Sequence, residues 1–112
     1  MSETDISRDI REALTKAGWR CERINSGKVK VNGGWMHLAQ KGFPDTLVMK
    51  PGRPKTAGGS GGITGFLETK TDIGKLNEDQ KAWHAWAVKS GFNVATVRSR
   101  AEALSAVKEW EN

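Results

Sequence analysis

The sequence has little of what stabilises secreted or membrane-bound small proteins. A single cysteine, Cys21, among 112 residues excludes a disulfide framework and a cysteine-based zinc site. No run approaches the roughly 20 apolar residues that span a bilayer, and the opening segment MSETDIS lacks the basic and apolar regions of a signal peptide. We therefore expect one domain over residues 1–112, in the cytoplasm and with no membrane partner.

The charge is unevenly distributed along the chain. The net charge is +5, but residues 1–15 carry −2, residues 16–55 carry +7 and residues 56–112 carry 0. The whole excess lies in the least regular segment, which suits contact with the phosphates of a polyanion. Lysines that only confer solubility are the alternative, and charge alone does not separate the two.

Apolar spacing predicts three helices and four strands. The helices are expected over residues 3–17, over residues 77–90 and from Ser99 onwards, each with capping residues at its start. Short apolar runs predict strands over residues 19–25, 45–50, 63–70 and 92–99, separated by a loop or hairpin at 26–42 and a Gly/Pro-rich connection at 51–62.

The order of these elements defines the expected fold class. A strand–helix–strand unit from residue 63 to 98 implies a parallel pair with a right-handed crossover. The earlier strands are joined by loops and are expected to be antiparallel. The result is a small mixed β-sheet flanked by helices, an α/β sandwich of order α-β-β-β-α-β-α.

Two acids and a lysine stand out as chemical groups. Glu68 and Lys70 are two apart near the end of a predicted strand, so their side chains share one face. If the strand that begins at Asp45 pairs with it, the two carboxylates lie side by side. Adjacent carboxylates repel each other unless a cation lies between them, and hard oxygen ligands suit Mg²⁺ or Mn²⁺. An ion pair between Glu68 and Lys70 on a solvated strand is the alternative.

The same residues carry a family resemblance. The blocks RINSG, KGFPDTLVM, FLETKT, GKLNEDQKAWH and VATVRSRAEAL resemble the small stand-alone VRR-NUC (virus-type replication-repair nuclease) domains of phages and prophages. These domains belong to the PD-(D/E)XK nuclease superfamily. The resemblance covers nearly the whole chain and implies a restriction-endonuclease-like fold in a bacterial or phage-infected cell. It also implies metal-dependent hydrolysis of DNA phosphodiester bonds.

The resemblance assigns roles to individual residues. Asp45, Glu68 and the main-chain carbonyl of Thr69 become metal ligands for Mg²⁺ or Mn²⁺. Lys70 becomes the residue that acts on the attacking water and on charge at the phosphate.

Two further residues are implied with alternatives beside them. Gln80 matches a helix glutamine of the family, although it also has the spacing of a capping box with Asn77. The family's first helix supplies another acid. Helical geometry favours Glu3, on the apolar side of the helix, over Glu12 on the opposite side.

The expected DNA-binding residues lie mostly in the basic segment. Asn25 and Ser26 match the family turn RINSG, and the cations expected to hold the backbone are Lys28, Lys30, Lys41, Lys50, Arg53 and Lys55. The Gly/Pro-rich connection at 51–62 is expected to close over DNA or to be disordered without it.

The resemblance implies activity on branched or Holliday-junction-like DNA by a homodimer. Trp86, Trp110 and the last helix are expected interface elements. Trp83 and Trp86 are expected in the core or an interface rather than as base-stacking platforms. The alternatives are a non-catalytic DNA-binding or dimerisation module, a small sequence-specific restriction-type endonuclease and, more remotely, an RNA-binding module.

Overall fold

A computed structural model describes residues 1–24, 28–37 and 41–111 of the chain. Three α-helices, six strands and one short 3-10 helix lie within these residues. Their bounds are α1 Glu3–Lys16, β1 Arg20–Arg23, β2 Lys28–Val31, β3 Gly34–His37, β4 Thr46–Lys50, η1 Lys55–Ala57, β5 Ile63–Thr69, α2 Glu78–Lys89, β6 Asn93–Val97 and α3 Arg100–Trp110.

The main sheet has the strand order β1-β4-β5-β6. β1 pairs antiparallel with β4, and β4 pairs antiparallel with β5. β5 and β6 are parallel and are connected through α2. The predicted α/β fold, with its parallel pair and its antiparallel earlier strands, is confirmed.

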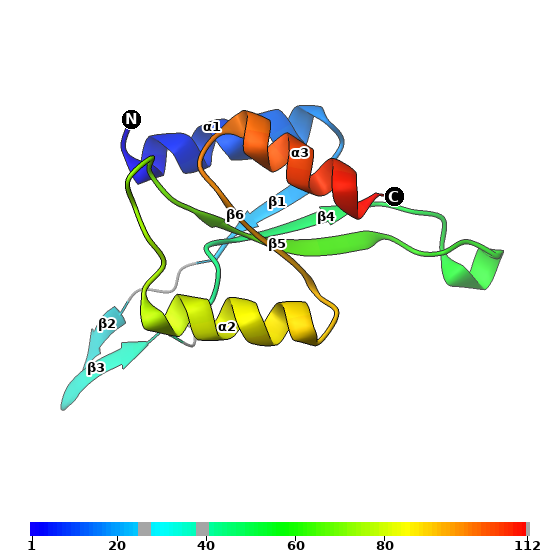
Figure 1. The fold of residues 1–112 in the computed structure, drawn as a ribbon. Coiled ribbons are helices and arrows are strands. Elements are labelled where there is room, and N and C mark those ends of the chain that lie inside the picture. The colour runs from blue at the N-terminus through cyan, green and yellow to red at the C-terminus, as the bar shows by residue number, and fades with distance from the viewer. Residues whose placement is uncertain (25–27, 38–40, 112) are drawn as a thin grey trace.

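The structure adds two elements to the predicted order. The segment predicted as a loop or hairpin contains β2 and β3, which pair as a separate two-stranded sheet. The connection at 51–62 contains η1. Figure 1 shows β2 and β3 projecting from the end of the molecule at which α1 begins.

Helix ends follow the predicted capping residues. The Ser2 side chain accepts a hydrogen bond from the amide of Asp5, and Asn77 and Gln80 form a reciprocal capping box at α2. Ser99 accepts from the amide of Glu102 at the start of α3. These local bonds satisfy amides that have no partner within the helix.

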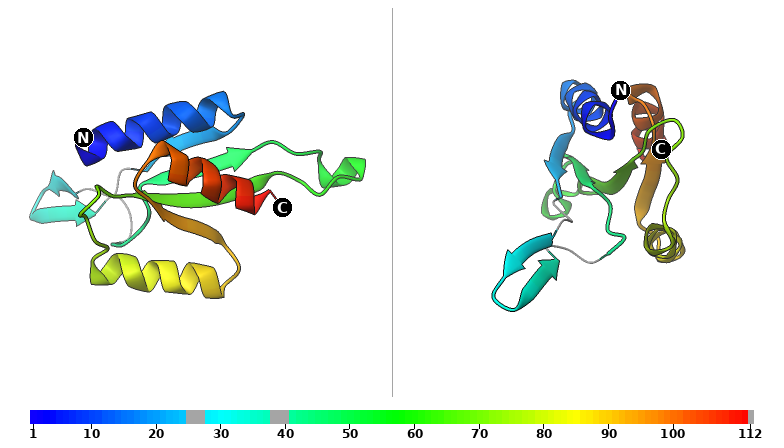
Figure 2. Two further views of the ribbon diagram at one scale, coloured as in Figure 1. Left: turned by 45° about the horizontal axis from the view of Figure 1, so that its top comes forward. Right: turned by 90° about the vertical axis from the view of Figure 1, so that its left-hand side faces the viewer.

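The two faces of the sheet are covered differently. α1 and α3 lie side by side over one face, which we call the closed face, and α2 lies on the other, which we call the open face (Figures 1 and 2). Nine buried residues form one core under α1 and α3: Ile6, Ile10, Leu14, Trp19, Val48, Leu67, Val97, Ala103 and Val107. α2 packs against β6 among the described strands. No helix in the described parts of the chain is long and apolar enough to cross a membrane.

Candidate metal centre and its surroundings

Three carboxylates from three separate elements converge at one end of the sheet. Glu3 is the first residue of α1, Asp45 directly precedes β4, and Glu68 lies near the end of β5. One ligand oxygen from each lies within 4.8 Å of the other two. The β4–β5 register, which pairs Thr46 with Leu67, places Asp45 opposite Glu68 as the sequence predicts.

The cluster strongly perturbs one of its own carboxyl groups. Glu68 is only 3% exposed, and burial is the main reason that its pKa rises from 4.5 to about 9. The adjacent Asp45 carboxylate raises this pKa further, and Glu3 adds a smaller contribution in the same direction. Lys70, which directly follows β5, lowers it through its positive charge. Burial and the neighbouring carboxylates thus raise the pKa of Glu68 by more than the positive charge of Lys70 lowers it.

Asp45 is held rigidly by two threonines. Its Oδ2 accepts a hydrogen bond of 2.8 Å from the backbone amide of Thr69. Its Oδ1 accepts bonds from the hydroxyls of Thr46 at 2.7 Å and Thr69 at 3.4 Å. In a strand, the amide and carbonyl of one residue point to the same side. The Thr69 carbonyl therefore faces the same edge as Asp45.

Gln80 combines the two roles that its sequence position left open. Its Oε1 accepts a hydrogen bond from the amide of Asn77 and thereby completes the capping box of α2. Its Nε2 donates to Oε1 of Glu68 over 3.3 Å. The start of α2 is thus tied to the buried carboxylate by one side chain.

Arg98 is a supporting residue that the sequence did not reveal. Its Nη1 donates to the carbonyl of Thr71 at 2.5 Å and to that of Gly74 at 2.6 Å. These bonds hold the turn that leads from Lys70 to α2. Arg98 lies one residue beyond β6, within a block of the family resemblance that suggested no role for it, so only the folded turn reveals its role.

The donor set fits a hard divalent cation. Carboxylate oxygens and a main-chain carbonyl are the ligands that Mg²⁺ and Mn²⁺ prefer. A cation among Glu3, Asp45 and Glu68 would remove the repulsion that raises the pKa of Glu68. Glu12, the other acid considered on α1, instead forms an exposed ion pair with Lys16 of 3.4 Å.

The expected DNA-binding residues fall in two places. Lys41 is exposed in the turn before Phe43, and β2, which contains Lys28 and Lys30, lies at the end of the molecule where α1 begins. Asn25 and Ser26 lie outside the described residues.

The remaining expected cations, Lys50, Arg53 and Lys55, lie at or beyond the opposite end of β4 from Asp45. Lys50 pairs there with Glu111, and its Nζ is 5.9 Å from the centroid of the Trp19 ring. The connection at 51–62 therefore does not flank the carboxylates, because β4 separates the two.

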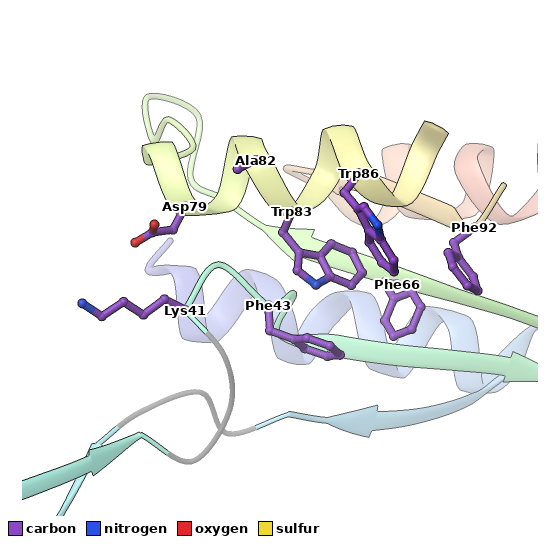
Figure 3. Close-up of a pocket in the computed structure, with 8 residues that line it drawn as sticks. All are labelled: Lys41, Phe43, Phe66, Asp79, Ala82, Trp83, Trp86 and Phe92. Atoms are coloured by element: carbon purple, nitrogen blue, oxygen red, sulfur yellow. The ribbon is translucent and has the colours of Figure 1, made fainter. Parts of the chain in front are cut away.

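The open face carries an aromatic groove (Figure 3). It has a volume of about 610 Å³, and Phe43, Phe66, Trp83, Trp86 and Phe92 are among its lining residues. Trp83 is half-buried and Trp86 is 55% exposed, and neither is among the buried residues of the core under α1 and α3. Trp110 instead packs on the closed face against Trp19, with ring centroids 6.4 Å apart.

Comparison with known proteins supports the fold. No protein-family model matches the chain, and no curated protein matches it. A solved structure described as "VRR_NUC domain" is similar, with a TM-score of 0.65 and 21% sequence identity, over 95% of this chain and 94% of that chain. The resemblance predicted from the sequence is thus confirmed for the fold: the chain has the fold of this VRR_NUC domain.

Proposed function

We propose that the protein is a metal-dependent endodeoxyribonuclease that hydrolyses phosphodiester bonds in branched DNA. The observation that carries this proposal is the convergence of Glu3, Asp45 and Glu68 within 4.8 Å, with Lys70 beside them. A fold shared with a structure named as a VRR_NUC domain supports the choice of nuclease over other metal-dependent activities.

Each residue at the carboxylate cluster would have a separate role, which follows from its position. Asp45, Glu68 and the Thr69 carbonyl would hold Mg²⁺ or Mn²⁺, with Glu3 completing the site. When bound, such an ion supplies Lewis-acid stabilisation of negative charge on the phosphate. Gln80 keeps Glu68 oriented through its 3.3 Å hydrogen bond. Lys70 adds a fixed positive charge where the scissile phosphate gains negative charge.

DNA would approach at the end of the sheet that carries the carboxylates. Lys28, Lys30 and Lys41 lie toward this end and would contact the backbone on either side of the scissile phosphate. Lys50, Arg53 and Lys55 are about 17 Å further along, the length of the five residues of β4. These three cations would contact the same DNA about five base pairs from the scissile phosphate.

We further propose a homodimer, because two sites related by a twofold axis cut two strands of a branched substrate symmetrically. Trp110 is packed over Gly65 and is a poor interface element. Trp86, which is 55% exposed, and the outer side of α3, where Leu104 is 37% exposed, are the remaining expected surfaces. Light scattering that gives about the 12.3 kDa mass of one chain at working concentration contradicts the dimer.

Cleavage assays test the activity. Purified protein is incubated with linear duplex, flap and four-way-junction DNA in Mg²⁺, Mn²⁺ or EDTA. We expect cleavage of the branched substrates only with metal, and a loss of about 100-fold or more in Asp45→Asn, Glu68→Gln and Lys70→Met. Glu3→Gln and Glu12→Gln form a matched pair on α1, and only Glu3→Gln should impair cleavage.

Three outcomes contradict the proposal in different ways. Absence of cleavage with either metal, together with intact DNA binding, indicates a non-catalytic DNA-binding module. Cuts at a fixed sequence in linear duplex indicate a restriction-type enzyme. Unchanged rates in the Asp45 and Glu68 variants place the activity elsewhere.

Calorimetric titration with Mn²⁺ reports metal binding independently of cleavage.

A further inference from the structure

Two elements, β5 and α2, connect the aromatic groove to the carboxylates. Phe66 and Glu68 are two residues apart on β5, so their side chains share the open face. Trp83 follows Gln80 by one helical turn on α2, and Gln80 contacts Glu68. The Cα atoms of Phe66 and Glu68 are separated by about 7 Å at the rise of a strand.

The inner wall of the groove is a rigid aromatic cluster. The ring centroid of Trp83 lies 5.1 Å from that of Phe43 and 5.3 Å from that of Phe66, in edge-to-face geometry. The outer wall is formed by Trp86 and Phe92, which stack with centroids 5.6 Å apart and are 55% and 51% exposed. The two walls thus form an apolar surface before any ligand binds, and the two rings of its outer wall are about half exposed to solvent.

Two charged residues lie at the end of the groove toward the start of α2 (Figure 3). Lys41 and Asp79 both line it and are both exposed. The backbone next to Lys41 packs closely against the start of α2, because a Cβ on Gly42 would lie 2.3 Å from the carbonyl oxygen of Asp79. A cation beside a hydrogen-bond acceptor at the mouth of an aromatic groove complements a nucleotide, whose phosphate is anionic and whose base carries N–H donors.

We propose that this groove binds an unpaired nucleobase of the DNA, stacked on Trp86. Trp86 follows Gln80 by six residues of α2, about 9 Å along the helix axis. The base would therefore belong to a nucleotide within about three positions of the phosphate held at the carboxylates, since the rise per nucleotide is 3.4 Å in a strand of duplex DNA. The proposal rests on the proposed function for its substrate, DNA, but requires no cleavage.

The proposal defines which DNA the site prefers. Bases within a duplex are stacked and paired and do not reach a side groove, whereas bases at flaps, gaps and branch points do. Aromatic stacking accepts any base, so the groove selects for DNA structure and not for sequence. A second copy of this chain is the competing occupant. The concave shape and the charged mouth favour the nucleotide.

The test uses the full-length Asp45→Asn variant in EDTA, so that DNA is bound and not cut. The probes are flaps that carry the fluorescent base 2-aminopurine at each of the first four unpaired positions. We expect stacking to quench the fluorescence at one or two of these positions. Adding Trp86→Ala should abolish the quenching and weaken flap binding about tenfold, while binding of a fully paired duplex changes less than twofold.

Val88→Ala provides the matched control. Val88 is on the same helix as Trp86 and is 64% exposed, but it does not line the groove. The control should leave quenching and affinity unchanged. Trp86→Phe retains a ring and should preserve part of the quenching, which separates loss of stacking from loss of folding.

Three results overturn the proposal. One is quenching that survives Trp86→Ala, and another is an equal loss of flap and duplex affinity. The third is conversion of a dimer to a monomer by Trp86→Ala in light scattering, which assigns the groove to a second copy. Position-specific quenching that depends on Trp86, in a protein that cuts no DNA, rejects the nuclease and retains the base site.

Discussion

The two faces of the sheet differ in how completely they are buried. On the closed face, Val48 of β4 and Leu67 of β5 have no exposed surface. On the open face, their neighbours Leu47 and Phe66 are only partly buried. The alternation of the strands thus sorts adjacent residues of the same apolar type into two environments.

The closed face carries the residues that stabilise the fold, whereas the open face carries the candidate functional groups. The closed face carries the buried hydrophobic core. Glu68 shares the open face with Phe66, and α2, which covers that face partially, brings Gln80 and the aromatic groove to it. A face that remains accessible is able to bind ions and DNA, whereas a filled core is not.

The largest expected effect on stability comes from shortening a leucine side chain, and this effect should differ between the two faces. Leu67→Ala removes a side chain with no exposed surface and should lower the free energy of unfolding by about 2–5 kcal/mol, through lost burial and the cavity left behind. Leu47→Ala on the open face should cost less than half as much. Urea denaturation measures both, and equal losses would contradict the distinction between the faces.

A smaller effect comes from overfilling the closed face. An added Cβ on Gly65 would lie 2.3 Å from the ring of Trp110, so Gly65→Ala should displace that ring and cost about 1–3 kcal/mol. An added Cβ on Gly91 would have no neighbour within 4 Å, but the backbone of this residue has a positive φ of 86°. Gly91→Ala therefore tests backbone strain alone. Near-ultraviolet circular dichroism should change for Gly65→Ala and not for Gly91→Ala.

The smallest expected effect has the opposite sign. The pKa of Glu68 rises from 4.5 to about 9 on folding, so between these pH values the folded state binds a proton that the unfolded state has released. Without metal, stability therefore decreases as pH rises across this range. Glu68→Gln removes this dependence and should raise the Tm at pH 8 by about 4 °C or more.

Metal and a control variant sharpen this prediction. Mg²⁺ or Mn²⁺ should raise the Tm of the unmodified protein at pH 8 and have little effect on Glu68→Gln, because binding to the folded state stabilises it. Glu12→Gln should follow the unmodified protein at every pH, since Glu12 is in an exposed ion pair. Parallel pH profiles for the Glu68 variant and the unmodified protein would contradict a buried, repelled carboxyl group at this position.

Much of the site follows from local patterns. The two-residue spacing of Glu68 and Lys70 and the strand predicted to begin at Asp45 indicate a pair of carboxylates. The family resemblance adds an acid from the first helix, for which helical geometry favours Glu3 over Glu12, and the structure brings Glu3, Asp45 and Glu68 together. The sequence does not indicate at which end of β4 the basic connection at 51–62 lies, because net charge along the chain carries no information about which end of a strand a loop occupies. The length and direction of β4 place it away from Asp45.

The sequence by itself determined the order of the three α-helices and of the four strands of the main sheet, and the capping residues of the helices, because these depend on periodicity and short-range hydrogen bonds. It also identified Asp45 and Glu68 as the principal acids. Only the tertiary structure decided that Gln80 both caps α2 and contacts Glu68, that Arg98 holds the turn after Lys70, and that five aromatic residues form one groove. These contacts join segments that are 12 to about 50 residues apart. Their geometry depends on strand register and helix packing, which no local pattern encodes.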